Sequence, residues 1–474
     1  MERDIRFLLN DSLERVSLPP GQVVLDFLRR DRRLTGTREG CREGDCGACL
    51  VLLGELQDGR VRYRPVSSCL LPLGDLEGRH LATIEGLNPP SPQAPTLNPI
   101  QRALVEQGAI QCGFCTPGFV LALTAFFLEA PRIEEAGALD WLAGNICRCT
   151  GYASIRRAVG ELIAGYPAGK PEEEGPGARR LERLIAWGLL PEHFRQAPAR
   201  LAELRRGPGR AGGTERVLVA GGTDLFVQRP EALLGAGLEF LSGRLSLAGV
   251  RGEGGRVVIG AATPMEDLRG VEPFGEYLEL IASSPIRNRA TVGGNIVNAS
   301  PIGDLTIMLL ALNAVLSLRG PQGLREIALE RFYRGYKQLD LQAGEALESV
   351  SFPALGGGRR FSFEKVSRRK HLDIASVNSA ACLSLQDGRV LEARLSAGGV
   401  APVPLYLRRT SEAMAGREAD SGTVKHAMRL AQEEASPISD VRGSAEYKRL
   451  LLRQLLIAHF LRLAPERVEV GKLL

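Results

Sequence analysis

Apolar and polar positions in the first 165 residues predict a small sheet followed by a helical part. Ile5–Leu9 and Val16–Leu18 have the pattern of a short hairpin. Periodic apolar residues further on predict helices over Val24–Arg30, Ile100–Gln107, Pro117–Leu128 and Ser154–Ile163, with a strand at Ala48–Leu53. The later helices would bury Phe119, Leu123, Phe126, Ile155 and Leu162 in a small bundle.

The pattern becomes irregular beyond this part. Residues 167–178 (PAGKPEEEGPGA) are typical of an exposed linker, Arg179–Leu190 has the pattern of a short helix, and Pro198–Gly213 is again loop-like. GPGRAG at 207–212 fits G-x-G-x-x-G, but it precedes a strand and contains a proline, so we reject it as a dinucleotide motif.

The remaining chain mixes strands and helices. The apolar run Leu305–Leu318, like Gly118–Leu128, is too short to span a bilayer and is expected to be a buried helix. We expect strands at Arg216–Ala220, Ala375–Leu385 and Val390–Ser396, and amphipathic helices near Val424–Glu434 and Ala445–Leu463.

Composition narrows the class of protein. A chain of 474 residues with 44% hydrophobic and 24% charged residues is typical of soluble globular protein, with about three domains. A net charge of +5, spread over the whole chain, argues against a nucleic-acid partner. The N-terminus has no apolar targeting segment, so we expect a cytoplasmic protein with no membrane partner.

Cysteine placement is the most informative feature. Eight of the nine cysteines fall in the first 149 residues, in two groups of four, whereas Cys382 lies alone in an apolar run and is expected to be buried on a strand. Cytoplasmic thiols stay reduced, so clustered cysteines indicate metal sites rather than disulfides.

The first group is Cys41, Cys46, Cys49 and Cys69. The spacing C-x4-C-x2-C, with a distant fourth cysteine, is that of a plant-type [2Fe–2S] cluster. Glycines in the loop CREGDCGAC let the backbone turn its N–H groups toward the sulfurs. A four-cysteine zinc site is the alternative, but zinc favours two C-x2-C pairs.

The second group is Cys112, Cys115, Cys147 and Cys149, in QCGFCTPG and NICRCTGY. A C-x2-C pair combined with C-x-C is unusual for zinc and suits a second two-iron cluster held between helix ends.

These three motifs in this order closely resemble the iron–sulfur half of molybdenum hydroxylases, the xanthine dehydrogenase group. The resemblance implies that the second cluster lies nearer the molybdenum centre, and that Gln111 contacts molybdopterin on a partner chain.

Two glycine-rich segments follow. The strand RVLVA leads into Gly221–Asp224 (GGTD), whose successive N–H groups suit phosphate oxygens. Residues 283–305 (SSPIRNRATVGGNIVNASPIGDL) offer a second close backbone approach at Gly293–Gly294. The residues themselves indicate anion- or nucleotide-binding loops, with polar turns as the alternative.

Both segments resemble the FAD segments of the same enzymes. The resemblance implies FAD contacts from Leu218, Val219, Ala220, Gly221, Gly222, Thr223, Asp224, Leu225, Thr291, Gly293, Gly294, Asn295, Asn298 and Asp304, a pocket lined by Ile281 and Leu347, and Lys365 near the flavin. Gly222 and Asp224 stand where many relatives carry Asn and Glu.

The resemblance also implies an α+β multidomain fold. Its parts would be a plant-type ferredoxin-like β-grasp domain (1–80), a helical [2Fe–2S] domain (81–165), a linker (166–212), a PCMH-type FAD-binding domain (213–356) and an α+β flavoprotein C-terminal domain (357–474).

After the flavin segments only about a hundred residues remain, too few for a large molybdenum domain. The resemblance implies that the partner is a molybdopterin-binding large subunit, in a heterotetramer of two small and two large chains. We expect xanthine or hypoxanthine oxidation there, with electrons passing through both clusters to FAD and then NAD⁺. Alternatives are an aldehyde or another N-heterocycle as substrate, and O₂ or a ferredoxin as acceptor. A further alternative, of a different class, is a stand-alone electron-transfer or assembly protein without its own substrate.

Metal and flavin analysis tests this interpretation. Because each group of four thiols would hold two irons, the purified protein should contain about four irons and one flavin per chain, with a yellow-brown spectrum. Zinc in place of iron, or a protein without flavin, would contradict it.

Overall fold

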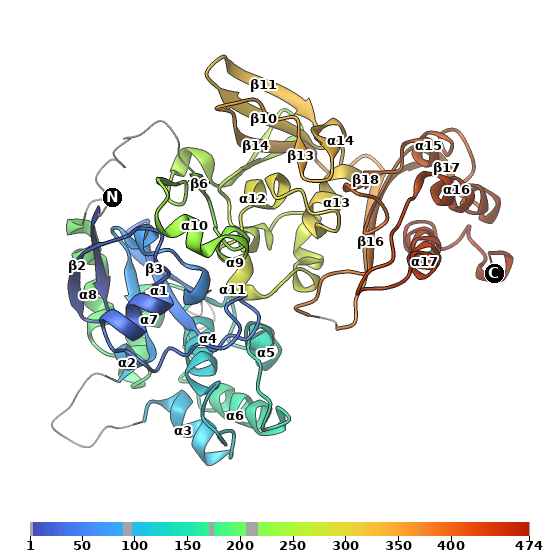
Figure 1. Cartoon of the computed structure of the whole chain (residues 1–474). Coiled ribbons are helices and arrows are strands. Elements are labelled where there is room, and N and C mark those ends of the chain that lie inside the picture. The colour runs from blue at the N-terminus through green and yellow to red at the C-terminus, as the bar shows by residue number, and fades with distance from the viewer. Residues whose placement is uncertain (1–2, 89–96, 170–174, 205–216, 370, 474) are drawn as a thin grey trace. The chain divides into compact units, whose positions relative to one another are not determined.

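The computed structural model describes residues 3–88, 97–169, 175–204, 217–369 and 371–473 (Figure 1). The chain divides into two compact units, of which the first comprises Met1–Ser242 with Ser283–Arg289, and the second comprises Gly243–Ala282 with Ala290–Leu474. The motif GPGRAG and residues 170–174 of the predicted linker lie outside the described residues.

A five-stranded sheet begins the first unit. Its order is β2-β1-β5-β3-β4, with β1 and β5 parallel and the other neighbours antiparallel. The strands of this unit are β1 (Arg3–Leu9), β2 (Ser12–Leu18), β3 (Leu50–Gln57), β4 (Arg60–Ser67), β5 (His80–Ala82), and the parallel pair β6 (Val217–Val219) and β7 (Leu238–Phe240). The predicted hairpin is confirmed, and the predicted strand at Ala48–Leu53 corresponds to β3.

Helix α1 and a following π-helical turn, η1, cover one face of this sheet, where the rings of Phe7 and Phe27 meet edge to face at 5.8 Å. The helices of the first unit are α1 (Val24–Asp26), η1 (Phe27–Asp31), α2 (Ile84–Leu87), α3 (Pro99–Glu106), α4 (Thr116–Glu129), α5 (Glu135–Trp141), α6 (Ala153–Ala164), α7 (Ala178–Ala186), α8 (His193–Glu203), α9 (Leu225–Gln228), α10 (Pro230–Leu234) and α11 (Ser284–Arg287). Short 3-10 turns are η2 (Ser68–Leu70), η3 (Leu73–Leu76) and η4 (Leu142–Gly144).

Helix α4 is the centre of the helical part. Its residues Gly118–Leu128 are all buried, and α3, α5 and α7 pack against it. The five residues predicted to fill this bundle are buried as expected. Apolar burial on every side explains why the run lacks the polar face of a surface helix.

The predicted linker contains more structure than its composition indicates. The short helix expected at Arg179–Leu190 is confirmed as α7, but the loop expected from Pro198 is wrong up to Glu203, because α8 includes Pro198. Burial of Phe194, Ala197 and Leu201 in the same core as α4 outweighs the cost of an internal proline.

The described part of the second unit contains two larger antiparallel sheets and the two-stranded antiparallel pair β12-β13. The first has the order β11-β10-β14-β9-β8, and the second has the order β15-β16-β17-β18. The strands are β8 (Val250–Glu253), β9 (Arg256–Gly260), β10 (Val315–Gly320), β11 (Gly323–Ala328), β12 (Tyr333–Gly335), β13 (Gln338–Leu339), β14 (Ala346–Pro353), β15 (Arg359–Val366), β16 (Val377–Gln386), β17 (Arg389–Gly398) and β18 (Leu405–Tyr406).

Helices cover these sheets, with α17 packed on β15 and β16, and α13 on β16 and β17. The helices are α12 (Val292–Val297), α13 (Asp304–Ala311), α14 (Leu329–Phe332), α15 (Arg408–Glu412), α16 (Ser421–Glu434) and α17 (Ala445–Leu463), with 3-10 turns η6 (Leu245–Leu247), η7 (Met265–Leu268), η8 (Phe274–Glu276), η9 (Leu278–Leu280) and η10 (Val470–Lys472). The two strands and two helices predicted after residue 374 are confirmed, and Cys382 is buried on β16.

The buried helix predicted over Leu305–Leu318 is wrong beyond Ala311. Asn313 has a φ of 59°, which ends the helix, and the chain continues as β10 from Val315. Hydrophobicity alone does not distinguish a buried helix from a buried strand. No helix in the described segments has the length and apolar character needed to cross a membrane.

Buried His80 predicts a pH-dependent stability of the first unit. Its Nδ1 lies 2.8 Å from the Tyr63 hydroxyl and its Nε2 lies 2.9 Å from the Asn10 carbonyl oxygen. Burial lowers the pKa of His80 from 6.5 to about 3. As the pH falls below 6.5, His80 is protonated in the unfolded state but stays neutral in the folded state. Its contribution to the free energy of unfolding therefore decreases by about 1.4 kcal/mol per pH unit.

His80→Gln keeps one donor and one acceptor but cannot titrate. We expect the variant to lose less stability than the parent between about pH 6.5 and pH 5, measured by urea unfolding. Both tryptophans, Trp141 and Trp187, lie in the first unit, so their fluorescence reports its unfolding. Equal pH dependence of the two proteins would contradict the assignment.

Candidate functional site

The first group of thiols is assembled by the loop between η1 and β3 together with η2. The Sγ atoms of Cys49 and Cys69 lie 3.4 Å apart and are buried, because the β3–β4 hairpin places the start of β3 beside the end of β4. Cys41 lies beside Cys46, whose thiol, together with the backbone N–H groups of Glu43 and Asp45, lowers the pKa of Cys41 to about 4.

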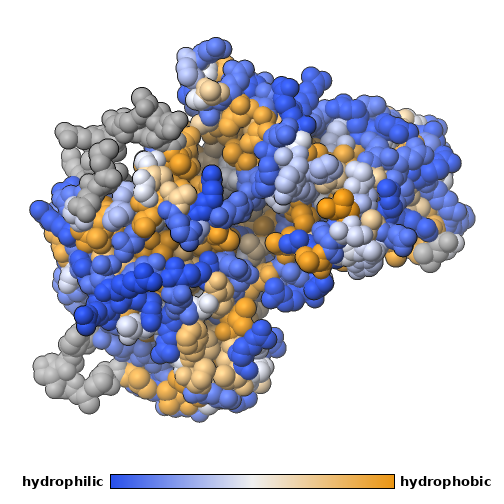
Figure 2. Space-filling model, viewed as in Figure 1, coloured by the Kyte–Doolittle hydropathy of each residue, from blue (hydrophilic) through white to orange (hydrophobic). Residues whose placement is uncertain are grey.

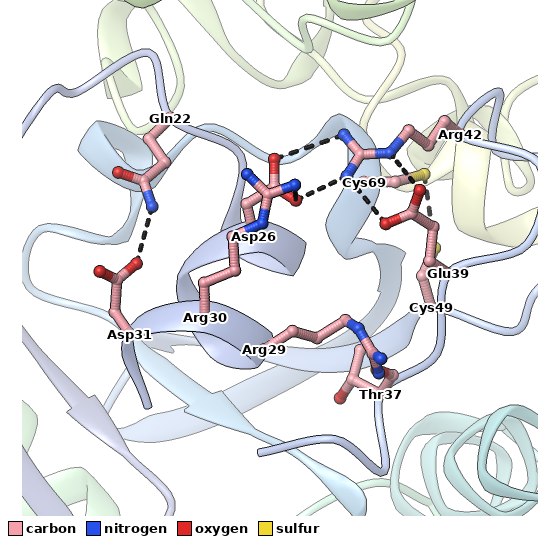
Figure 3. Close-up of polar contacts among 10 residues, drawn as sticks. All are labelled: Gln22, Asp26, Arg29, Arg30, Asp31, Thr37, Glu39, Arg42, Cys49 and Cys69. Carbon is pink, nitrogen blue, oxygen red and sulfur yellow. Dashed lines mark hydrogen bonds and ion pairs between the residues drawn. The ribbon is translucent and has the colours of Figure 1, made fainter. Parts of the chain in front are cut away.

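Arg42 holds this loop against α1 (Figure 3). Its guanidinium contacts both carboxylate oxygens of Asp26, at 2.6 and 3.3 Å, and both of Glu39, at 2.8 and 2.9 Å. The same contact lowers the pKa of Glu39. Arg42 itself has a φ of 57°, so these contacts stabilise a backbone conformation that is unfavourable for a residue with a side chain. Arg42 is part of the CREGDC motif, but nothing in the sequence points to its partners Asp26 and Glu39.

The second group of thiols lies at the ends of α4 and α6. The Sγ atoms of Cys112 and Cys149 are 3.6 Å apart and both residues are exposed. Cys115 caps α4 and lies beside buried Cys147, and burial together with this neighbour raises the pKa of Cys115 to about 12. The N–H of Cys147 donates to the Tyr152 hydroxyl at 3.0 Å.

Each group therefore contains two pairs of neighbouring thiols. A tetrahedral metal with metal–sulfur bonds of about 2.3 Å separates two of its thiolates by roughly 3.8 Å, close to the measured sulfur distances. Within the described segments, no three Cys, His, Asp or Glu side chains converge on a single metal ion. Thiols grouped in twos fit a cluster of two irons, each with two thiolates.

The two groups are directly connected. The N–H of Ile146, the residue before Cys147, donates to the Cys46 carbonyl at 3.0 Å, and the Asn145 amide donates to the Gly47 carbonyl at 3.4 Å. A Cβ on Gly47 would lie 2.5 Å from both the Gly144 oxygen and the Asn145 amide nitrogen. A glycine is therefore required where the two loops meet.

An exposed surface surrounds the outer pair of thiols. Gln111, beside Cys112, is exposed, and Phe114 and Tyr152 are 42% and 39% exposed to solvent. Val105 and Leu97 are further exposed apolar residues of this helical part, and Figure 2 shows apolar atoms on its outer surface. The exposure of Gln111 is compatible with contact to another molecule.

The first glycine-rich loop lies in the first unit and follows β6. Among the predicted FAD contacts, Leu218 and Val219 are the last two residues of β6 and Leu225 is the first residue of α9, whereas the loop itself consists of Ala220, Gly221, Gly222, Thr223 and Asp224. Among the described residues, the N–H groups of 221–225 donate to no backbone carbonyl. Gly222 has a φ of 75°, which turns successive N–H groups to one side of the loop. Such a run suits the oxygens of a phosphate.

The second glycine-rich segment belongs to the second unit from Ala290 onward. The Thr291 side chain caps α12 by accepting a hydrogen bond from the Gly294 N–H at 3.1 Å. Gly293 lies against Ala261, and a Cβ added to Gly293 would lie 2.7 Å from the Ala261 Cβ. Asn295 accepts from the Thr306 hydroxyl at 3.3 Å, and Asn298 is held by the Lys337 ammonium, 2.9 Å from its Oδ1.

Lys365 and Asp304 form a buried ion pair in the same unit. The Lys365 ammonium, with its side chain only 2% exposed, lies 2.8 Å from Asp304 and donates to the Leu280 carbonyl. Asn378 donates to the other Asp304 oxygen at 2.5 Å, a contact the sequence analysis missed. Burial raises the pKa of Asp304, and the ammonium partly offsets this effect. Ile281 and Leu347 are buried in the surrounding core.

Comparison with family models assigns four consecutive segments. The 2Fe-2S iron-sulfur cluster binding domain matches residues 7–73 and the [2Fe-2S] binding domain matches 83–160. The FAD binding domain in molybdopterin dehydrogenase matches 195–355, and the CO dehydrogenase flavoprotein C-terminal domain matches 362–463. The predicted α+β multidomain fold class is confirmed, as are domains that bind [2Fe–2S] clusters and FAD.

The chain is also similar to individual proteins. The chain is 27% identical to aldehyde oxidase 1 of Bos taurus and 28% identical to xanthine dehydrogenase of Emericella nidulans, each over 94% of this chain. It spans 38% of the length of either relative. A solved structure of Cu,Mo-CO dehydrogenase in a cyanide-inactivated form is 30% identical over 51% of this chain and 87% of that chain, with a TM-score of 0.48.

Gly47→Ala should disturb the junction between the two groups of thiols. Gly59, in the β3–β4 turn, offers a matched control, because its φ of 79° resembles the 70° of Gly47 but nothing lies within 4 Å of its Cβ position. We expect Gly59→Ala to cost about 1 kcal/mol of stability and to leave iron content unchanged. Gly47→Ala should cost more and lower the iron content, measured by metal analysis and visible absorbance. Equal effects of the two substitutions would contradict the proposed junction.

Proposed function

Because this chain has the iron–sulfur and FAD domain architecture of the molybdenum hydroxylase family, we propose that it passes electrons from a partner's molybdenum centre to FAD and then to NAD⁺. The observation that carries the proposal is the presence of two sets of paired thiols on a chain that also contains an FAD-binding domain. Two such sites on one chain are expected of an electron relay rather than of a structural metal protein.

The thiols divide between two [2Fe–2S] clusters. Cys41, Cys46, Cys49 and Cys69 hold the first, and Cys112, Cys115, Cys147 and Cys149 hold the second. When bound, each cluster carries one electron at a time, whereas FAD accepts two and can deliver a hydride to NAD⁺. The chain's own contribution is to fix the thiols in pairs, to direct N–H groups at Cys41, and to join both loops through the Ile146–Cys46 hydrogen bond.

FAD is assigned to the two glycine-rich segments. The N–H groups of 221–225 suit the pyrophosphate, since they lack backbone acceptors among the described residues. The remaining assignments follow the family resemblance: Thr291, Gly293, Gly294, Asn295, Asn298 and Asp304 as FAD contacts, Ile281 and Leu347 as pocket residues, and Lys365 near the flavin. In this assignment Lys365 holds the Asp304 carboxylate in place.

The molybdenum centre is assigned to a large partner subunit, in an assembly of two small and two large chains. The exposure of Cys112 and Cys149 supports a second cluster near the surface, beside Gln111 and the exposed rings of Phe114 and Tyr152. An exposed apolar rim around a redox group is typical of a docking surface. We assign Gln111 to contact with molybdopterin on that partner.

The proposed substrate is a purine, xanthine or hypoxanthine. The fusion of iron–sulfur and flavin domains on one chain supports this choice, and xanthine dehydrogenase is among the relatives. Aldehyde oxidases are also among them, so the second candidate substrate is an aldehyde or another N-heterocycle. Turnover of the native complex with a purine and with an aldehyde, each with and without NAD⁺ in air, separates the substrates and the acceptors.

Cys147→Ser tests the electron route. Loss of one thiolate from the second cluster should remove one of two [2Fe–2S] signals in electron paramagnetic resonance and slow flavin reduction by substrate at least about tenfold. Flavin reduction by NADH should persist, because it does not need that cluster. Cys382→Ser is the matched control, since Cys382 is buried on β16 outside both groups. Normal substrate-driven flavin reduction in Cys147→Ser would overturn the route.

A further inference from the structure

A buried charge cluster lies beside the first glycine-rich loop. Asp75, on η3 of the iron–sulfur part, is shared by two arginines, with Arg79 at 2.8 Å from Oδ1 and Arg289 at 2.6 Å from Oδ2. The side chains of Asp75 and Arg79 are each 3% exposed and that of Arg289 is 8% exposed. The Ser242 hydroxyl also donates to Asp75.

Arg289 differs from Arg79 in one contact. Its second terminal nitrogen donates to the Gly221 carbonyl at 3.1 Å, so one planar guanidinium bridges Asp75 and the glycine-rich loop. Arg79 instead donates to the Asp75 carbonyl and contacts Glu55. The two arginines thus have similar burial and share one carboxylate, but only Arg289 contacts the loop.

The carbonyl that Arg289 holds controls the direction of the next N–H group. In a trans peptide the C=O of Gly221 and the N–H of Gly222 point in opposite directions. Fixing the carbonyl toward Arg289 therefore turns the Gly222 N–H away from it, and the positive φ of Gly222 continues the run of N–H groups without backbone acceptors. Arg289 acts on any ligand of this loop only through the peptide that it orients.

We propose that Arg289 is a positioning residue for the FAD pyrophosphate, which it serves by anchoring the Gly221–Gly222 peptide to Asp75 of the iron–sulfur part. The proposal rests on the proposed function, which places FAD in this loop. In this proposal, Arg289 fixes the loop that receives the flavin phosphates to Asp75, which lies in the segment that follows the cluster ligand Cys69. Arg289 belongs to the short segment Ser283–Arg289 that the first unit takes from the middle of the FAD-binding domain.

The test compares Arg289→Met with Arg79→Met in the full chain. Each substitution leaves Asp75 with one arginine and Ser242, so their effects on stability should be similar. FAD affinity is measured by titrating FAD into deflavinated protein and following flavin fluorescence and visible circular dichroism. We expect Arg289→Met to weaken FAD binding about tenfold or more and Arg79→Met to change it less than about threefold. Both [2Fe–2S] signals should persist in both variants.

Arg289→Lys separates positioning from stability. One ammonium can keep the ion pair with Asp75 but cannot reproduce the planar fork that also reaches Gly221. We expect stability in urea to recover toward that of the parent while FAD affinity stays reduced. This variant also keeps the test decisive if Arg289→Met does not fold.

The outcomes are distinct. A parent protein that binds no FAD would overturn the proposed function itself. A parent that binds FAD, with unchanged affinity in Arg289→Met, would overturn only the role of Arg289. Equal weakening by Arg79→Met, or full recovery of affinity by Arg289→Lys, would also overturn it, since either result indicates a general effect of the charge cluster.

Discussion

The spacing of sulfur atoms around a shared metal is the constraint on which the iron–sulfur part depends. Four thiols must lie in two neighbouring pairs, although their positions in the chain are separated by as many as 37 residues, as between Cys112 and Cys149. The β3–β4 hairpin meets this requirement for Cys49 and Cys69, and the ends of α4 and α6 meet it for the second group. Glycines and left-handed residues in the connecting loops follow from the same requirement, because the backbone must curl around the sulfurs.

Polar contacts then fix the loops that carry the thiols. Arg42 ties the first loop to Asp26 and Glu39, and Asn145 ties the second loop to the first through the Gly47 carbonyl. The buried cluster of Asp75, Arg79 and Arg289 fixes the first glycine-rich loop in the same way, because Arg289 also donates to the Gly221 carbonyl. A buried carboxylate shared by two guanidiniums is costly to desolvate, and loss of either guanidinium is strongly destabilising. The cluster therefore favours one arrangement of the segments that supply its residues.

The elements that the sequence predicted well are those with a strong local signal. The N-terminal hairpin, α4 and the C-terminal helices have regular apolar spacing, and the structure contains them. Errors arose where burial competes with local preference. Pro198 lies inside α8 because three neighbouring apolar residues are buried, and the apolar run after Leu305 changes from helix to strand at Asn313. Pro198 itself argues against the helix that forms around it, whereas Asn313 is a local signal of the second change.

The sequence by itself determined the chemistry of the chain. Thiol spacing and glycine pairs specify which atoms can meet a cluster or a phosphate, because these depend on residue type and short-range backbone geometry. Only the tertiary structure decided which distant charges meet: Lys365 with Asp304, and Arg289 with Asp75 and Gly221. Partners 61 and 214 residues apart leave no local pattern, since burial in a common core, rather than spacing along the chain, brings them together.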